Sequence, residues 1–187
     1  MRRAHVSLCL AMLAVPAAAG AAAAQGGKAP TSAAAPASGD TSGLRWAPGQ
    51  GGAVPSGAQA TGYDPGGFLF TCRAQIEGGT HPGKMRPGLA GCYVPLGGRE
   101  VQVQQYEVLM GSSYTWVVSR DGTIPAGAVE GGRTRTAQQL YICRAAAYDG
   151  RSAMLVPGKT GAGLRGCNVG FDSRESTAAM YEVLVRR

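Results

Sequence analysis

The chain contains the stretch CRAQIEGGTHPGK at residues 72–84 and a second version of it, CRAAAYDGRSAMLVPGK, at residues 143–159. Both begin with Cys-Arg-Ala and end with Pro-Gly-Lys. Cys92 follows Lys84 by eight positions, as Cys167 follows Lys159, and each copy goes on to a Tyr-Glu-Val-Leu segment. The same order of segments twice over, with equal spacing from the lysine onward, indicates a tandem repeat.

The repeat extends upstream of these stretches, because Trp46 and Trp116 are offset by 70 positions. We place repeat one at residues 44–110 and repeat two at residues 114–187. Together they are long enough for one domain with a substantial core, which would bury roughly 70% of the surface of its unfolded chain.

Short segments rich in β-branched and aromatic residues predict strands at residues 68–74, 101–110, 114–119, 140–145 and 180–185. Gly and Pro clusters between them predict turns, and we interpret each Pro-Gly-Lys segment as a turn whose lysine faces outward. No window shows sustained helical periodicity. The expected fold is therefore all-β: an antiparallel β-sandwich-like domain made of two tandem repeats related by a pseudo-twofold axis.

The N-terminus predicts export. Residues 1–24 have a short basic start and then an Ala-rich apolar stretch too short to span a bilayer stably, which is typical of a cleavable signal peptide. Residues 25–43 are mostly Ala, Pro, Gly, Ser and Thr and are expected to form a disordered linker. The composition, dense in Ala, Gly and Arg, is typical of bacteria, so we expect a secreted or periplasmic protein without a membrane span.

The formal charge of +7 falls to about +5 once Arg2 and Arg3 leave with the signal peptide. The remaining basic residues are scattered singly, with no run of them and no aromatic platform among them. This distribution argues against a nucleic-acid partner. Weak attraction to anionic surfaces of the cell envelope is the expected consequence.

Four cysteines remain once Cys9 is removed, two per repeat at matching positions. An even number in an exported chain indicates disulfides. The pairing that respects the repeat joins the two cysteines within each copy, Cys72 with Cys92 and Cys143 with Cys167. Bridges between the repeats, or buried free thiols, remain open at this point. The wide cysteine spacings argue against a zinc site, and we expect no bound metal.

Two segments resemble enzyme motifs without the context those motifs need. Residues 153–160 come close to a phosphate-binding loop but begin with Ala153, and residues 161–166 match a dinucleotide pattern without the required strand and helix. His81 is the one histidine after the signal peptide and occurs in one copy only. We therefore expect no catalytic residue, no cofactor and no enzyme activity. A hydrolase that uses carboxylates alone, from Asp64, Glu100 and Glu175, stays open at this point.

The order Trp, Val-Pro or Ile-Pro, Cys-Arg-Ala, Pro-Gly-Lys, Gly-Cys and Tyr-Glu-Val-Leu resembles the tandem DM-nine repeat proteins, which include mannose-binding lectins of invertebrate innate immunity. The resemblance implies a compact β-sandwich-like pair of repeats without catalytic activity. It also implies a sugar site at Asp64 and Lys84, the positions that match the family's Asp and Lys. A carboxylate and an ammonium can bind the same pair of vicinal hydroxyls through charge-assisted hydrogen bonds.

Repeat two departs from this pattern, because the position facing Asp64 falls on Arg133 or Thr134. Lys159 therefore lacks an obvious carboxylate partner, and its site is expected to be weak, altered or absent. Glu100 and Glu175 recur at equal spacing and are interpreted as carboxylates beside the ligand or in contact with it.

Other repeated residues are expected to be structural. The tryptophans should lie in the core rather than stack on sugars. The arginine of each Cys-Arg-Ala segment should pair with an acid inside the fold, with these possible partners: Glu107 for Arg73 and Glu182 for Arg144.

The sequence thus favours an exported, non-enzymatic carbohydrate-binding domain of the mannose-type lectin kind. Its expected partners are mannose-like glycans or cell-envelope polysaccharide, with a possible homodimer to supply avidity. The alternative is a structural or interaction module of the bacterial envelope that binds no sugar.

Overall fold

The structure is a computed structural model that describes residues 43–161 and 163–187. This part is all-β and antiparallel, and it contains no helix, as predicted. The predicted signal peptide, and the predicted linker up to residue 42, lie outside the described residues. The strands are β1 (Arg45–Gln50), β2 (Gly62–Asp64), β3 (Gly67–Ile76), β4 (Gly79–Met85), β5 (Cys92–Leu96), β6 (Arg99–Val103), β7 (Gln105–Met110), β8 (Tyr114–Arg120), β9 (Glu130–Arg133), β10 (Gln139–Tyr148), β11 (Ala153–Gly161), β12 (Cys167–Phe171), β13 (Arg174–Ala178) and β14 (Met180–Arg186).

The strand order shows the predicted pseudo-twofold relation directly. From one end the sheet runs β1-β7-β3-β2-β11-β12-β13, and from the other end it runs β8-β14-β10-β9-β4-β5-β6. The two series correspond strand by strand, because each strand in one series is the counterpart of the strand at the same position in the other. They meet where Arg174 of β13 lies opposite Arg99 of β6. The additional pairings β3–β4 and β10–β11 close the sheet on itself.

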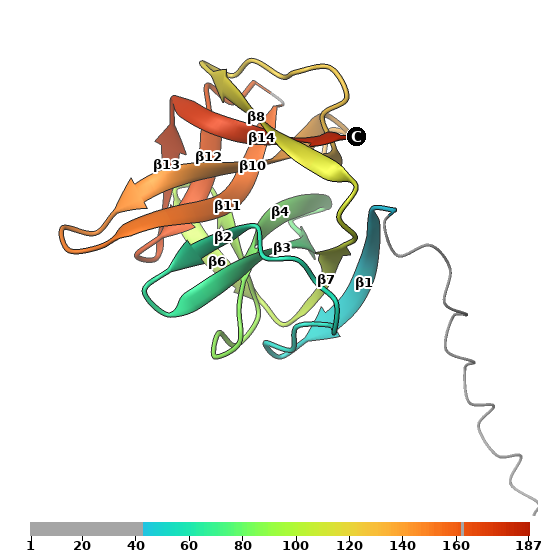
Figure 1. The fold of residues 1–187 in the computed structure, drawn as a ribbon, viewed down its shortest axis with the longest axis vertical. Coiled ribbons are helices and arrows are strands. Elements are labelled where there is room, and N and C mark those ends of the chain that lie inside the picture. The colour runs from blue at the N-terminus through green and yellow to red at the C-terminus, as the bar shows by residue number, and fades with distance from the viewer. Residues whose placement is uncertain (1–42, 162) are drawn as a thin grey trace, which may run out of the picture. The chain divides into compact units, whose positions relative to one another are not determined.

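The two repeats interlock rather than sit side by side as separate units. The short strand β2 of repeat one pairs with β11 of repeat two, with Tyr63 opposite Leu155. In return, β9 of repeat two pairs with β4 of repeat one, with Arg133 opposite Thr80. Figure 1 shows the green strand β2 of repeat one next to the orange strand β11 of repeat two.

The core consists of one apolar cluster in each repeat and a third cluster to which both contribute. Leu69 of repeat one packs into the cluster of repeat two, and the third cluster joins Leu109 to Leu184. Both disulfides have the pairing that respects the repeat, with Cα atoms 5.9 Å apart in each. They join β3 to β5 in repeat one and β10 to β12 in repeat two.

The predicted structural pairs are confirmed. Arg73 binds Glu107 at 2.7 Å and Arg144 binds Glu182 at 2.6 Å. Each guanidinium also lies over the tryptophan of its own repeat, 4.2 Å from the ring of Trp46 in repeat one and 4.1 Å from the ring of its counterpart in repeat two. The tryptophans are half-buried and pack against the third cluster, so they are structural here.

Two predictions about local structure are wrong. Residues 101–110 form two strands, because the chain leaves β5 at Gln104 and changes partner to β1 and β3. The Pro-Gly-Lys segments are not turns but lie inside β4 and β11. Several short strands, such as β9 and β13, also escape prediction because they are rich in Gly or polar residues.

Candidate functional site

The lysines that occupy the same position in the two repeats are both buried, so the expectation that they face outward is wrong. Lys84 is 7% exposed and Lys159 is 3% exposed. The preceding glycines explain the close packing: a Cβ at Gly83 would lie 2.2 Å from the carbonyl oxygen of Tyr93, and one at Gly158 would lie 2.1 Å from that of Asn168. Only glycine lets β5 and β12 approach so closely.

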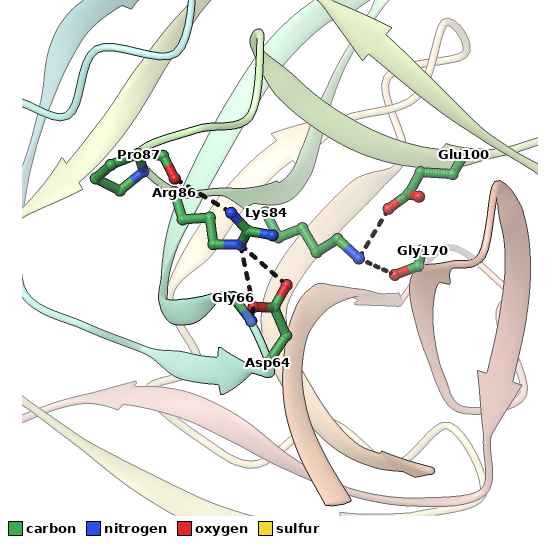
Figure 2. Close-up of polar contacts among 7 residues, drawn as sticks. All are labelled: Asp64, Gly66, Lys84, Arg86, Pro87, Glu100 and Gly170. Carbon is green, nitrogen blue, oxygen red and sulfur yellow. Dashed lines mark hydrogen bonds and ion pairs between the residues drawn. The ribbon is translucent and has the colours of Figure 1, made fainter. Parts of the chain in front are cut away.

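Lys84 is engaged inside the protein. Its Nζ lies 3.0 Å from Oε1 of Glu100 and donates a hydrogen bond of 2.6 Å to the carbonyl oxygen of Gly170. The approach to Glu100 lies outside hydrogen-bonding angles, so that contact is coulombic rather than a directed hydrogen bond. Figure 2 shows the ammonium directed at these two residues. Removing either charge would leave the other buried and uncompensated.

Asp64 is also engaged, but by a different cation. Its carboxylate accepts hydrogen bonds from Nε of Arg86 at 3.0 and 3.1 Å and from the backbone N–H of Gly66 at 2.8 Å. Figure 2 shows the carboxylate turned to Arg86 and the ammonium of Lys84 turned the opposite way. A sugar bridging Asp64 and Lys84 would therefore have to displace Arg86.

Lys159 differs from its counterpart because it lines a cavity of about 220 Å³. In the described part of the chain its hydrogen-bond partner is Nδ1 of His81, 3.3 Å from Nζ. Burial lowers the pKa of Lys159 to about 8, against the opposing effect of nearby carboxylates. Burial and the charge of Lys159 together lower the pKa of His81 to about 4. Near neutral pH the histidine is thus an uncharged acceptor beside a mostly protonated amine.

Glu175 is the counterpart of Glu100, but its carboxylate is bound by other groups than the ammonium of Lys159. Its Oε1 accepts a hydrogen bond of 2.8 Å from Nδ2 of Asn168, and its Oε2 accepts one of 2.8 Å from the backbone N–H of Gly98. Thr177 donates to the other end of the Asn168 amide at 2.9 Å, which fixes its orientation. The amide thus holds the carboxylate away from the ammonium.

The strand registers identify the counterpart of Asp64 as Thr134. Gly62 lies opposite Leu69 in repeat one and Gly132 lies opposite Leu140 in repeat two, so the residues two positions on also correspond. Thr134 lines the cavity. The residue that corresponds to Arg86 is Gly161, so repeat two lacks the ion pair that engages Asp64 in repeat one.

The cavity combines polar and apolar walls from both repeats. The Lys159 ammonium is a donor, Glu175 supplies carboxylate oxygens, and Leu96, Leu140 and Leu164 supply apolar surface. Such a mixture suits a small ligand with hydroxyls on its edge and C–H groups on its face. The Thr134 hydroxyl is engaged within its own turn, where it accepts from the backbone N–H of Gln138 and contacts the hydroxyl of Thr136. Among residues 43–161 and 163–187 no group of three or more His, Cys, Asp or Glu side chains is placed to hold a metal ion.

Sequence reasoning named four residues that lie at the two lysines: Lys84, Lys159, Glu100 and Glu175. It gave Thr134 as one of two candidates for the counterpart of Asp64, and it missed His81 and Asn168 as wall residues. His81 directly precedes the Pro-Gly-Lys segment of repeat one, but it contacts the lysine of repeat two. That contact depends on the interlocked topology, and no spacing in the sequence indicates it. The structure brings Lys159 and Glu175 to one cavity and leaves Asp64 in its ion pair with Arg86.

No helix in the described part of the chain has the length and apolar character to cross a membrane. No curated protein matches the chain at a significant level. Two overlapping segments, residues 34–103 and 64–178, match the DM9 repeat family. That family is associated with carbohydrate-binding lectins and is not a known enzyme family. With matches that span both copies, interlocked in one antiparallel sheet, the chain belongs to the DM9 repeat family as a tandem repeat protein.

Proposed function

We propose that the protein is an exported, non-enzymatic carbohydrate-binding protein that holds a mannose-type sugar in the cavity at Lys159. One observation carries this proposal: a buried ammonium lines a cavity of about 220 Å³ with His81 as its hydrogen-bond partner in the described residues. An ammonium has three N–H donors, so two remain for ligand hydroxyls. The association of the family with lectins supports the same reading.

The recognition chemistry follows from the walls of the cavity. Lys159 donates to one sugar hydroxyl, and Glu175 accepts from the same hydroxyl or from its neighbour through charge-assisted bonds. The leucines contact the less polar face of the ring. A monosaccharide of about a dozen non-hydrogen atoms gains roughly 4 kcal/mol at about 0.3 kcal/mol per atom, which corresponds to a Kd of about 1 mM.

Weak single-site binding of this kind needs avidity to be useful. A homodimer, or a ligand that repeats along a cell-envelope polysaccharide, would supply it. The two intrachain disulfides support a place in an oxidising compartment, outside the cytoplasm. If residues 1–24 are a signal peptide, the mass of the protein recovered from the cell envelope or the medium will be lower by that segment.

In this proposal, Asp64 and Lys84 have a secondary role. Both are engaged by protein groups, Asp64 by Arg86 and Lys84 by Glu100 and Gly170. A sugar would have to break these contacts before it could bind. These contacts favour a structural role for Asp64 and Lys84. The alternative function, a structural module of the envelope, predicts the same role for Lys159.

The test is titration of the purified protein with methyl α-mannoside, followed by NMR or calorimetry. Lys159→Met should abolish saturable binding while the protein stays folded, because it removes a buried charge and keeps the volume of the side chain. Arg151→Met is the matched control, since Arg151 is an exposed cation of the same repeat in the β10–β11 turn. Equal binding by the wild type and Lys159→Met, or no binding by the wild type at millimolar sugar, would contradict the proposal.

A further inference from the structure

A groove whose walls mix polar, charged and apolar side chains lies mostly on repeat one, and it shares no wall residue with the Lys159 cavity. Two concavities, of about 480 and 200 Å³, share Arg73, Gln75, Thr80 and Glu107 in their walls. We call this feature the outer groove and define it by these four residues with Gln105 and Arg133. A volume of about 480 Å³ lies in the usual range of ligand sites, roughly 300–1,000 Å³.

The strand registers show that the outer groove is continuous. Glu107 of β7 lies opposite Arg73 of β3, Gln75 of β3 lies opposite Thr80 of β4, and Thr80 lies opposite Arg133 of β9. The groove therefore crosses four neighbouring strands. At about 4.8 Å between strands it extends for about 14 Å, which is longer than one sugar ring.

The charges in the outer groove are paired within the protein. Arg73 binds Glu107 at 2.7 Å, and Arg133 binds Glu130, another wall residue, also at 2.7 Å. Two cations and two anions leave no net charge to attract a polyanion or a polycation. The remaining polar groups are amides and a hydroxyl, with Nε2 of Gln75 donating to Oγ1 of Thr80 at 2.7 Å. Such a surface is complementary to a neutral ligand rich in hydroxyls.

Repeat two shows that the fold does not require these polar residues. It keeps the arginine–glutamate pair, and a concavity of about 320 Å³ lies at the equivalent place. Its walls are apolar, however, because the counterparts are Ala146 for Gln75, Leu155 for Thr80 and Met180 for Gln105. The three polar side chains Gln75, Thr80 and Gln105 are therefore particular to repeat one, and the fold does not require them.

We propose that the outer groove of repeat one binds a strand of neutral polysaccharide. This site is separate from the Lys159 cavity and does not depend on it. The walls of the groove contain two ion pairs and several amides, whereas the centre of a protein–protein interface is depleted in charged residues. Its exposed glutamine amides offer both donors and acceptors, which hydroxyl groups along a sugar chain can use in either sense.

The test replaces the three polar residues by those that occupy the same positions in repeat two: Gln75→Ala, Thr80→Leu and Gln105→Met in one variant. The equivalent sites of repeat two hold these residues, so the variant should keep its circular dichroism spectrum. Binding is measured by calorimetry with neutral pentasaccharides of mannose, glucose and xylose. The wild type should bind at least one of them, and the triple variant should bind it at least tenfold more weakly.

Met180→Gln is the matched control, because it adds an amide at the counterpart of Gln105 and should leave pentasaccharide binding unchanged. Methyl α-mannoside titrated into the same variants reports on the Lys159 cavity, so failure of one site is distinguishable from failure of the other. The proposal is overturned if none of the pentasaccharides binds the wild type at millimolar concentration, or if a folded triple variant binds as tightly as the wild type.

Discussion

The clearest quantitative prediction concerns His81, whose counterpart in repeat two is Val156. Because Val156 is fully buried at the equivalent place, valine is a side chain that this fold accepts there. His81→Val removes the imidazole that accepts from Lys159 and leaves the rest of the cavity in place. The variant isolates the effect of one buried titratable group on stability.

The magnitude follows from the pKa. Burial, and the charge of Lys159 at 3.3 Å, lower the pKa of His81 from 6.5 to about 4. Below pH 6.5 the unfolded chain takes up a proton at this residue that the folded protein does not, so stability is full above that pH and falls as the pH falls towards 4. At 1.36 kcal/mol per pH unit, the loss attributable to His81 approaches roughly 3 kcal/mol.

The assay is urea unfolding of wild type and His81→Val between pH 7 and pH 4, followed by tryptophan fluorescence. Carboxylates also titrate in this range, but they contribute to both proteins, so the difference between the two free energies of unfolding reports on His81. That difference should move by roughly 3 kcal/mol in favour of the variant as the pH falls. A difference that stays constant across the range would refute the assignment of a buried, neutral imidazole.

Three further predictions concern the scaffold. Replacing Cys143 and Cys167 together by alanine should lower the free energy of unfolding by about 3 kcal/mol, measured by urea denaturation, because the bridge closes a loop with a sequence separation of 24. Gly158→Ala should prevent folding or lower the melting temperature severely, because its Cβ would lie 2.1 Å from a backbone oxygen of β12. Arg174→Glu should raise stability by about 0.5 kcal/mol, because it replaces the like charge opposite Arg99 by an opposite one; unchanged or lower stability at low salt would contradict this.

The sequence predicts the fold of this protein well because its signals are local. The strand residues of β3 and β10, the even cysteine count and the recurring Tyr-Glu-Val-Leu segments predict an all-β duplicated domain with intrarepeat disulfides. The pairing of Arg73 with Glu107 also follows, because both occur on strands of the same repeat. Each of these features can be inferred within one copy and checked against the other.

The candidate site is predicted less well, because its contacts cross between copies. Pro-Gly normally indicates a turn, but here the glycine allows a close crossing of strands and carries the lysine into the interior. The match to the family's Asp and Lys indicated Asp64 and Lys84, yet a neighbouring arginine, two residues beyond that lysine, engages the carboxylate. Nothing in residue spacing distinguishes a carboxylate that faces a ligand from one that faces Arg86.

The unequal lysines have a common structural cause. Each lysine receives a partner from the other repeat: Lys84 donates to the carbonyl of Gly170 in β12, and Lys159 meets His81 in β4. A change in one copy therefore alters the surroundings of the lysine in the other copy as well as its own. Repeat two could gain an open cavity while repeat one closed on an ion pair, without any change in the strand framework that both share. It follows that an isolated repeat would contain neither environment, and that the proposed sugar site at Lys159 depends on the interlocked pair.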